Sequence, residues 1–489
     1  MKKYLIFIIF TLEFVKNKFH MAKEDVKNLN GEIQVLKERI DALDQLNKEL
    51  ANQNEDLREE NDRHAEMLAF LPADAKKQMS KKAKTSSSLR YKMVTVLYSD
   101  VKGFIELSQE QDAEALIDEL DNFFFQFDEV VERFNIQKVK SLGDTYMCAG
   151  GIPKKNRTNP VEVIRAALEM QVFLKEMQDE SKKNDKNIWS LTFGVHTGPV
   201  TATVSGKRKI SYDIKGDTAN IASRIESASK PTEISVSGMT YEFIKEFFAC
   251  EYRSKMPVKY KGDVPVYVVK GYRPDLSIDG LGKEPNKAFR TKFQIVKFED
   301  LNDYVLDRLE RELPKHLYYH NYKHTIDVTI GVEIIGYGEG VGEEDMLLLK
   351  TAALFHDFGQ VEGAIDHEEK GCIIAEEVLP EFGYDKEQIE IIKGIIMATK
   401  LPPQPKTKLE QIIADADLDY LGRRDMVPVS DTLYQELKVQ GIIGSFNDWN
   451  KLQVKFLSMH QYFTETARTM RTVNKEVQIE RIKELITED

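Results

Sequence analysis

A leucine repeat with a period of seven residues limits what the first part of the chain can form. Leucine stands at every seventh position from Leu29 to Leu71, with His64 as the exception. The a positions of this heptad are Val26, Ile33, Ile40, Asn47, Asn54, Asn61 and Leu68. Leucine at d with β-branched residues at a favours a parallel two-stranded coiled coil, and asparagine at a fixes its register at a cost in stability. Because a lone surface helix needs no such seam, residues 21–72 are predicted to pair two copies of the chain.

Two short segments flank this heptad region. Residues 1–20 hold an apolar run from Tyr4 to Phe10, which is too short to span a bilayer and leads to no small-residue cleavage site. Two interpretations stay open for them: a mis-called start with Met21 as the initiator, or a weak peripheral membrane contact. Residues 73–91 are rich in lysine and serine and are expected to form a solvated linker.

Length, charge and cysteine content narrow the classes of protein. A chain of 489 residues is too long for one ordinary core, so two or three domains are expected. The net charge of -12 argues against a nucleic-acid partner, because phosphate binding needs a basic face. The three cysteines lie far apart in the sequence, which suits a reduced, cytoplasmic compartment without a disulfide framework.

Residues 92–273 alternate short apolar strands with amphipathic helices. The expected elements are a strand at 93–98, a helix at 113–134, a hairpin at 139–148, a helix at 161–177, a hairpin at 189–204 that turns at Gly198-Pro199, and a helix at 221–229. This alternation predicts an α+β fold with helices packed on one face of a sheet. Asp100 ends the first strand and Asp144 lies in a hairpin turn, so the two carboxylates can hold divalent cations together.

A second boundary is expected at residues 274–295, where prolines and glycines gather. Residues 296–489 are then expected to be almost wholly helical. The helical periodicity covers 299–313, 322–337, 344–358, 367–380, 385–399 and 444–487. Four glycines between 336 and 342 imitate a phosphate loop, but no strand precedes them, so a plain turn between helices is predicted.

Four words in the α+β region carry a family resemblance. They are "VTVLYSDVKGF" (94–104), "KVKSLGDTYM" (138–147), "FGVHTGPV" (193–200) and "YDIKGDTANIASRIES" (212–227). Together they resemble the catalytic domain of class III adenylate and guanylate cyclases over roughly 180 residues. The resemblance implies a ferredoxin-like core that pairs head to tail, with active sites at the interface of a homodimer. One chain carries the full residue set, so two equivalent sites are expected.

The resemblance also implies the chemistry and its residues. Two Mg²⁺ or Mn²⁺ ions would be held by Asp100, Asp144 and the backbone of Val101. The ribose 3′-hydroxyl would attack the α-phosphate of ATP, and pyrophosphate would leave. The residues that the resemblance places on the substrate are Gly103 and Phe104, whose backbone lies at the phosphates, Asn220 at the ribose, Arg224 at the transferring phosphorus, and Lys259 at the phosphates, with Lys261 as an alternative.

Base choice rests on a pair of side chains at the positions that set specificity in this family. Lys140 only donates hydrogen bonds and suits adenine N1, whereas Asp213 only accepts them and suits the adenine amino group. Guanylate cyclases carry glutamate and a small residue there, so the pair indicates ATP. The alternative is a surface salt bridge between the two. Ile105 departs from the usual threonine, which is expected to alter kinetics.

Three words in the helical region resemble the HD superfamily of metal-dependent phosphohydrolases. They are "YHNYKHTIDV" (319–328), "AALFHDFG" (352–359) and "DADLDYLG" (415–422). The resemblance implies a site for one or two divalent metals formed by His324, His356, Asp357 and Asp417, with His320 as general acid and His367 near a second ion. The word "MATK" (397–400) lacks a histidine that many relatives have, which leaves the second metal in doubt.

Three functions compete on this sequence. The first is a homodimeric adenylate cyclase with an HD domain of regulatory or phosphohydrolase role, and with input from an upstream signalling partner. The second is a nucleotide or cyclic-nucleotide phosphohydrolase with the cyclase domain as sensor. The third is a scaffold that binds nucleotide without turnover. Because Asp100, Asp144, Asn220 and Arg224 are all present, the sequence favours the first.

Overall fold

The computed structural model describes most of the chain after the heptad region. The described residues are 87–102, 113–183, 190–205, 211–258 and 262–487, together with Gln34 and Lys37. Gln34 and Lys37 are helical, whereas the rest of the predicted coiled coil, residues 1–20 and most of the 73–91 linker lie outside the described residues. Two units are distinguished, Met1–Leu89 and Arg90–Asp489, and almost everything below concerns the second.

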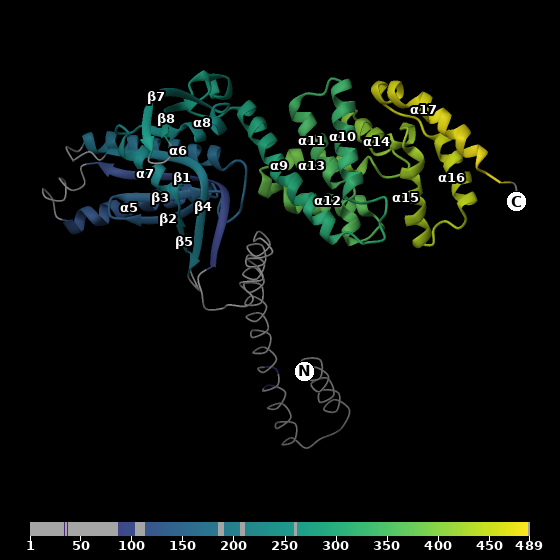
Figure 1. Cartoon of the computed structure of the whole chain (residues 1–489), viewed down its shortest axis with the longest axis horizontal. Coiled ribbons are helices and arrows are strands. Elements are labelled where there is room, and N and C mark those ends of the chain that lie inside the picture. Colours follow the sequence, from purple (N-terminus) through teal and green to yellow (C-terminus); the bar gives the residue numbers. More distant parts are fainter. Residues whose placement is uncertain are drawn as a thin grey trace, which may run out of the picture. The chain divides into compact units, whose positions relative to one another are not determined.

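Residues 87–272 form the α/β part, a mixed sheet with helices (Figure 1). Its strands are β1 (Ser87–Lys102), β2 (Gln137–Leu142), β3 (Thr145–Gly150), β4 (Ser190–Ser205), β5 (Ser211–Lys215), β6 (Ile234–Ser237), β7 (Phe248–Val258) and β8 (Gly262–Tyr272). Its helices are α5 (Ala113–Arg133), α6 (Asn159–Lys183), α7 (Asp217–Ser227) and α8 (Gly238–Ile244). The strand order among the described residues is β2-β3-β1-β4-β6-β8-β7, with β5 paired to β4. Only the β4–β6 pair is parallel among the pairs whose register is described, and the predicted α+β class is confirmed.

Helices cover both faces of β4, so the expectation of helices on one face was wrong. Leu191, Phe193 and Val195 pack into the core that contains α5 and α6. Gly194 points the other way, and a Cβ there would lie 2.2 Å from the backbone nitrogen of Glu226 in α7. Because side chains alternate between the faces of a strand, α7 lies on the face opposite to α5 and α6. The missing side chain of Gly194 makes room for it.

The hairpin expected at Gly198-Pro199 was also wrong, because β4 is one strand of 16 residues. It pairs with β6 over residues 193–195 and with β5 over residues 201–205. Gly198-Pro199 lies between these two stretches, where the strand changes partner. Proline is tolerated at such a position because it has no N–H group to leave unpaired in the ladder.

Residues 287–487 form the helical part. Its helices are α9 (Lys287–Glu312), α10 (Tyr322–Gly338), α11 (Glu343–Phe355), α12 (His367–Val378), α13 (Lys386–Met397), α14 (Lys408–Asp417), α15 (Met426–Val439), α16 (Phe446–Met459) and α17 (Glu465–Glu484). The predicted helix over 444–487 is two helices, α16 and α17, which lie side by side (Figure 1). The chain breaks there because Asp415 accepts hydrogen bonds from the backbone of Phe463 and Thr464, at 2.9 and 2.7 Å. No helix among the described residues combines the length and apolar character needed to cross a bilayer.

The helix α9 belongs to both hydrophobic cores. Residues 274–286, within the expected linker, form two short 3-10 turns, and α9 begins at Lys287 with Asn286 as its N-cap. Phe289 and Phe293 pack into the core of the α/β part. Phe298 and Leu301, farther along the same helix, pack into the core of the helical part. The two parts of the unit are therefore joined by a continuous helix.

Replacing Gly194 with alanine tests the close packing of α7 on β4. The new methyl group would overlap backbone atoms of Glu226 and Ala222, which cannot move without shifting α7. We expect Gly194→Ala to lower the stability of the α/β part by about 3 kcal/mol. Differential scanning calorimetry measures this loss. The matched control is Gly394→Ala in α13, where the nearest atom lies 4.0 Å away and a gain of about 0.5–1 kcal/mol is expected.

Candidate functional sites

A tight turn brings Asp100 and Asp144 to one edge of the sheet. β2 and β3 pair up to Leu142 and Thr145, and Gly143 between them has φ of 57°, which glycine adopts without strain. The carbonyl of Asp144 accepts a hydrogen bond from the Val101 N–H at 3.0 Å. In the β1–β3 ladder Asp100 lies opposite Thr145, whose hydroxyl donates to Oδ1 of Asp100 at 3.1 Å. The structure therefore places both aspartates and the Val101 backbone at the same strand ends.

This edge carries more negative than positive charge. Partial burial, together with the charge of Asp100, raises the pKa of Asp144 above its usual value. Lys102 partly neutralises this negative charge. Its Nζ lies 3.4 Å from Asp100 Oδ2 and 3.0 Å from Oε1 of the buried Glu226. Carboxylate and carbonyl oxygens are the donors that Mg²⁺ and Mn²⁺ prefer, so the residues present fit such ions.

Asn220 and Arg224 lie on the exposed side of α7. The opposite side of this helix holds Ile221 and Ile225, which are buried in a cluster with Val266 of β8. Spacing of four residues places Asn220 and Arg224 one turn apart on the same face. Arg224 makes no ion pair with any of the described residues, so its guanidinium is available to a ligand or a second chain.

Lys140 on β2 and Asp213 on β5 are also exposed. The nearest described cation to Asp213 is Lys215, with Nζ and Oδ2 3.7 Å apart. The alternative salt bridge between Lys140 and Asp213 is not found in the described part of the chain. Gly103, Phe104 and Lys259 lie outside the described residues.

A second group of polar side chains gathers where three helices begin or end. His324 lies in the first turn of α10, His356 directly follows α11, and Asp417 ends α14. Nε2 of His324 is 3.0 Å from Oδ1 of Asp417 and 3.3 Å from Nε2 of His356. One ligand atom from each residue lies within 4.8 Å of the other two, which is a spacing that can hold a metal ion.

Asp357 adds a fourth donor to this group. Its buried Oδ2 lies 3.3 Å from His356 Nε2 and 3.5 Å from His324 Nε2, yet it has no hydrogen-bond partner. Nδ1 of His356 faces the Ala353 carbonyl at 2.8 Å, which directs Nε2 toward the group. A divalent cation would satisfy the unpartnered oxygen and both imidazole nitrogens, so these residues fit a metal.

Electrostatics in the group depend on the carboxylates. Burial by itself would lower the pKa of His356, but the charge of Asp357 and the contact with Asp417 hold it well above its usual value. Burial would raise the pKa of Asp357, but His356 and His320 hold it well below its usual value. The structure thus stabilises positive charge beside Asp357 and Asp417.

His320 and His367 flank the group on different elements. His320 precedes α10, and its Nδ1 contacts Oε1 of Glu436, a buried side chain of α15. Glu436 also accepts hydrogen bonds from the backbone nitrogens of Tyr319 and His320 at 2.9 and 3.1 Å. His367 begins α12, with Nε2 3.2 Å from Oδ1 of Asp357. The structure therefore brings both predicted histidines close to the proposed ligands.

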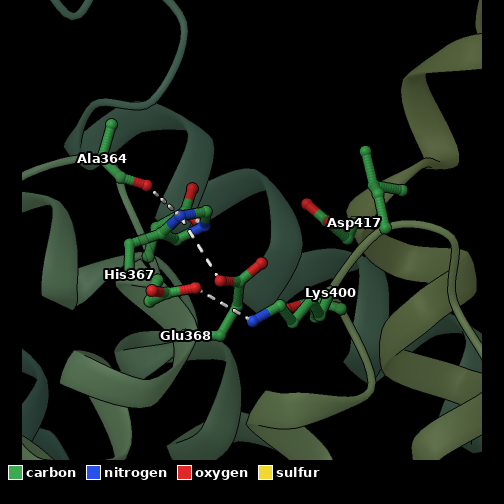
Figure 2. A pocket seen from close by; sticks show the side chains of 9 residues that line it. Ala364, His367, Glu368, Lys400 and Asp417 are labelled. Atoms are coloured by element: carbon green, nitrogen blue, oxygen red, sulfur yellow. Dashed lines mark hydrogen bonds and ion pairs between the residues drawn. The ribbon is translucent and has the colours of Figure 1, made fainter.

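A pocket of about 290 Å³ opens beside Asp357 and Asp417. Figure 2 shows His367 and Lys400 on its walls. Lys400 belongs to the "MATK" word, where a histidine was expected in relatives. Its ammonium group lies 3.2 Å from Oδ1 of Asp366 and contacts Glu369. A lysine therefore supplies positive charge at the rim of this pocket.

Two family models match the chain. Residues 87–271 match the adenylate and guanylate cyclase catalytic domain, and residues 321–419 match the HD domain. The chain contains a class III cyclase catalytic domain and an HD domain. The aspartate edge belongs to the cyclase domain, and the His324–His356–Asp417 group belongs to the HD domain.

The cyclase domain is similar to both adenylate and guanylate cyclases of known name. Adenylate cyclase of Mycobacterium tuberculosis (strain ATCC 25618 / H37Rv) is 32% identical over 213 residues, which is 43% of this chain and 47% of the relative. Receptor-type guanylate cyclase gcy-8 of Caenorhabditis elegans is 34% identical over 219 residues, which is 44% of this chain and 19% of the relative. The chain thus spans less than half the length of these curated relatives.

Solved cyclase structures match the same share of the chain. The adenylyl cyclase CyaB from P. aeruginosa is 30% identical, with 39% of this chain and 100% of that chain covered and a TM-score of 0.36. The catalytic core of a rhodopsin-guanylyl cyclase with converted specificity, in complex with ATPalphaS, is 31% identical, with 38% and 98% covered and a TM-score of 0.35.

Sequence reasoning missed three side chains that shape these sites. Lys102 and Glu226 stand inside the quoted cyclase words, but no spacing rule pairs residues that are 124 positions apart. Glu436 lies 116 positions after His320, in a helix that the sequence did not predict. No local signal marks such contacts, because packing between distant elements creates them.

Loss of the HD cluster should remove a bound metal. We expect the protein to retain a divalent ion such as Mn²⁺ through dialysis, and His356→Ala to lose it, because one imidazole donor and its orienting contact disappear together. Elemental analysis of an Asp144→Asn background, which disables the cyclase edge, measures the retained metal. The matched control is His316→Ala, an exposed histidine before α10. Equal metal content in both variants would contradict the assignment.

Proposed function

We propose that the chain is a homodimeric adenylate cyclase that converts ATP to 3′,5′-cyclic AMP and pyrophosphate, and that its HD domain hydrolyses a phosphoester or regulates the cyclase. This proposal rests mainly on the pair of aspartates in the cyclase catalytic domain, one at the end of β1 and one in the turn between β2 and β3. In the reaction the ribose O3′ forms a bond to the α-phosphorus, the bond from this phosphorus to the pyrophosphate oxygen breaks, and the hydroxyl proton is lost.

The aspartate edge supports metal-dependent chemistry. Asp100 and Asp144 would hold two Mg²⁺ or Mn²⁺ ions together with the Val101 backbone, and such ions supply polarisation of the phosphate and of the hydroxyl. Partial burial and then the charge of Asp100 raise the pKa of Asp144, and a divalent cation bound to the two carboxylates would oppose this shift. Lys102 holds β1 and α7 together through Glu226, which keeps the metal-bearing strand fixed relative to Asn220 and Arg224.

Exposure of the remaining residues supports a site shared between two chains. Lys140, Asp213, Asn220 and Arg224 all lie at the surface of one chain, where a second copy can bring them to the aspartates of its partner. Asn220 would orient the ribose, and Arg224 would neutralise charge on the phosphorus being transferred. The heptad region would supply the dimer contact.

Adenine is the base that Lys140 and Asp213 fit. A lysine ammonium donates to adenine N1, and a carboxylate accepts from the adenine amino group. Both side chains are exposed, and no ion pair joins them among the described residues, so both are available to a base.

The cluster of possible metal ligands in the HD domain favours a second activity there. Asp357, with its unpartnered buried oxygen, lies between two histidines beside a pocket of about 290 Å³. His320, whose Nδ1 contacts Glu436, would protonate a leaving oxygen. We infer a metal-dependent phosphohydrolase site, with a phosphoester as the class of substrate.

Removal of Asp144 tests the cyclase. Purified protein with ATP and Mn²⁺ should form cyclic AMP, and Asp144→Ala should abolish it because a metal ligand is lost. Arg224→Ala should lower kcat by about 100- to 1,000-fold, because charge on the phosphorus is no longer neutralised. His356→Ala should leave cyclic AMP formation intact and remove any hydrolysis by the HD domain. Product formation is followed by chromatography, and activity of Asp144→Ala equal to wild type would disprove the proposal.

Exchange of the base contacts tests specificity. Lys140→Glu with Asp213→Cys replaces a donor by an acceptor and removes the acceptor for the adenine amino group. We expect kcat/KM for ATP to fall and that for GTP to rise, so that their ratio reverses. The double variant Lys283→Glu with Glu284→Cys, at exposed positions after the residues that match the cyclase family model, is the control. An unchanged ratio in the Lys140–Asp213 variant would contradict the assignment.

A further inference from the structure

A pocket of about 700 Å³ lies where α16 turns into α17, after the residues that match the HD family model. Its walls include His460 from the turn and Lys475 and Arg468 from α17. None of these residues belongs to either site described above. We propose that this pocket binds a small oxyanion of the phosphate class and that its occupancy is coupled to the metal site of the HD domain.

His460 is a buried side chain with unused hydrogen-bonding capacity. It is 9% exposed, and neither ring nitrogen has a hydrogen-bond partner. Burial, with the charge of Lys475 close by, lowers the pKa of His460 to about 4, so the ring is neutral at neutral pH. A neutral imidazole has one donor and one acceptor, and leaving both unpaired in the interior is costly. A ligand that bonds one ring nitrogen would satisfy part of this capacity.

Lys475 brings positive charge to the same pocket. It is 8% exposed, and its Nζ donates to the backbone carbonyl of His460. An ammonium group has three N–H donors, so two remain for a ligand. Burial lowers the pKa of Lys475, and the charge of Glu476 offsets this lowering only in part. Arg468 at the rim makes no ion pair with the described residues.

The acidic groups on the walls do not cancel this charge. Glu480 pairs with Lys483 at 2.8 Å, and Glu476 is exposed to solvent. Lys475 and Arg468 thus remain as cationic donors around a neutral imidazole. Hydrogen phosphate fits this set, because its oxygens accept from the ammonium and guanidinium groups while its P–OH donates to one nitrogen of the imidazole.

The pocket is connected to the metal site through short contacts. Tyr462, another wall residue, donates a hydrogen bond to the Leu418 carbonyl at 3.4 Å. The next residues, Phe463 and Thr464, donate to the carboxylate of Asp415. Asp415 and Leu418 flank Asp417, the metal ligand on α14. A ligand that orders the turn at 460–464 would therefore change the position of Asp417 and, by linkage, the affinity for metal.

Calorimetry on the full-length protein tests the binding. Chelator-treated protein is titrated with inorganic phosphate, pyrophosphate and AMP. We expect at least one of the three to bind. We expect Lys475→Met and His460→Phe each to weaken this binding by about tenfold or more, because the first loses a charge-assisted hydrogen bond and the second loses the contact with the imidazole. Both variants keep the buried volume, so folding is checked by circular dichroism. Lys455→Met, an exposed position on α16 that lines no described wall of the pocket, is the control.

Comparison of the three ligands shows whether the pocket prefers a free anion or the phosphate group of a nucleotide. Tighter binding of AMP identifies a nucleotide phosphate, and tighter binding of phosphate or pyrophosphate identifies a free anion. Absence of binding by all three, or equal binding by wild type and both variants, overturns the site. The affinity for Mn²⁺ should change with phosphate in wild type but not in Lys475→Met. Phosphate binding that leaves the Mn²⁺ affinity unchanged overturns the coupling.

Discussion

The carboxylate of Asp357 is buried beside two imidazoles, and the arrangement of the HD domain depends on that contact. A charged group in the interior is tolerated when opposite charge or donors surround it. His356 and His324 approach one oxygen of Asp357, and His367 approaches the other. These residues come from α10, α12 and the end of α11, so the carboxylate ties three helices to one point. The same contact leaves one oxygen without a hydrogen bond, which is where a cation fits.

At the cyclase edge, too, carboxylates lie close to other charged groups, but they are less buried. Asp100 and Asp144 are brought together by a tight turn and by a backbone hydrogen bond from Val101. Partial burial and the charge of Asp100 raise the pKa of Asp144. Lys102 offsets part of the repulsion and reaches the buried Glu226 on the other side. In both domains, therefore, carboxylates lie beside cationic or imidazole side chains: Lys102 at the cyclase edge, and histidines in the HD domain.

The helix α9 connects these two chemical regions. Its first turns hold Phe289 and Phe293 in the sheet core, and its later turns hold Phe298 and Leu301 in the helical core. Arg157, in the loop before α6, reinforces the connection by pairing with Asp300 at 2.8 Å and Asp303 at 2.8 Å. The two cores therefore share one continuous helix and a pair of surface ion pairs.

The sequence by itself determined the α+β and helical character of the two regions, the words that carry both families, and the segments that hold Asp100, Asp144, His324, His356 and Asp417. These follow from local periodicity and from chemistry within short words. It did not determine that β4 continues through Pro199, that α7 lies on the second face of the sheet, or that Glu436 holds His320. Only the tertiary structure decided these, because they depend on which distant elements pack together. The missing side chain of Gly194 matters only once α7 lies against β4, and the buried carboxylate of Glu436 matters only once α15 lies beside His320.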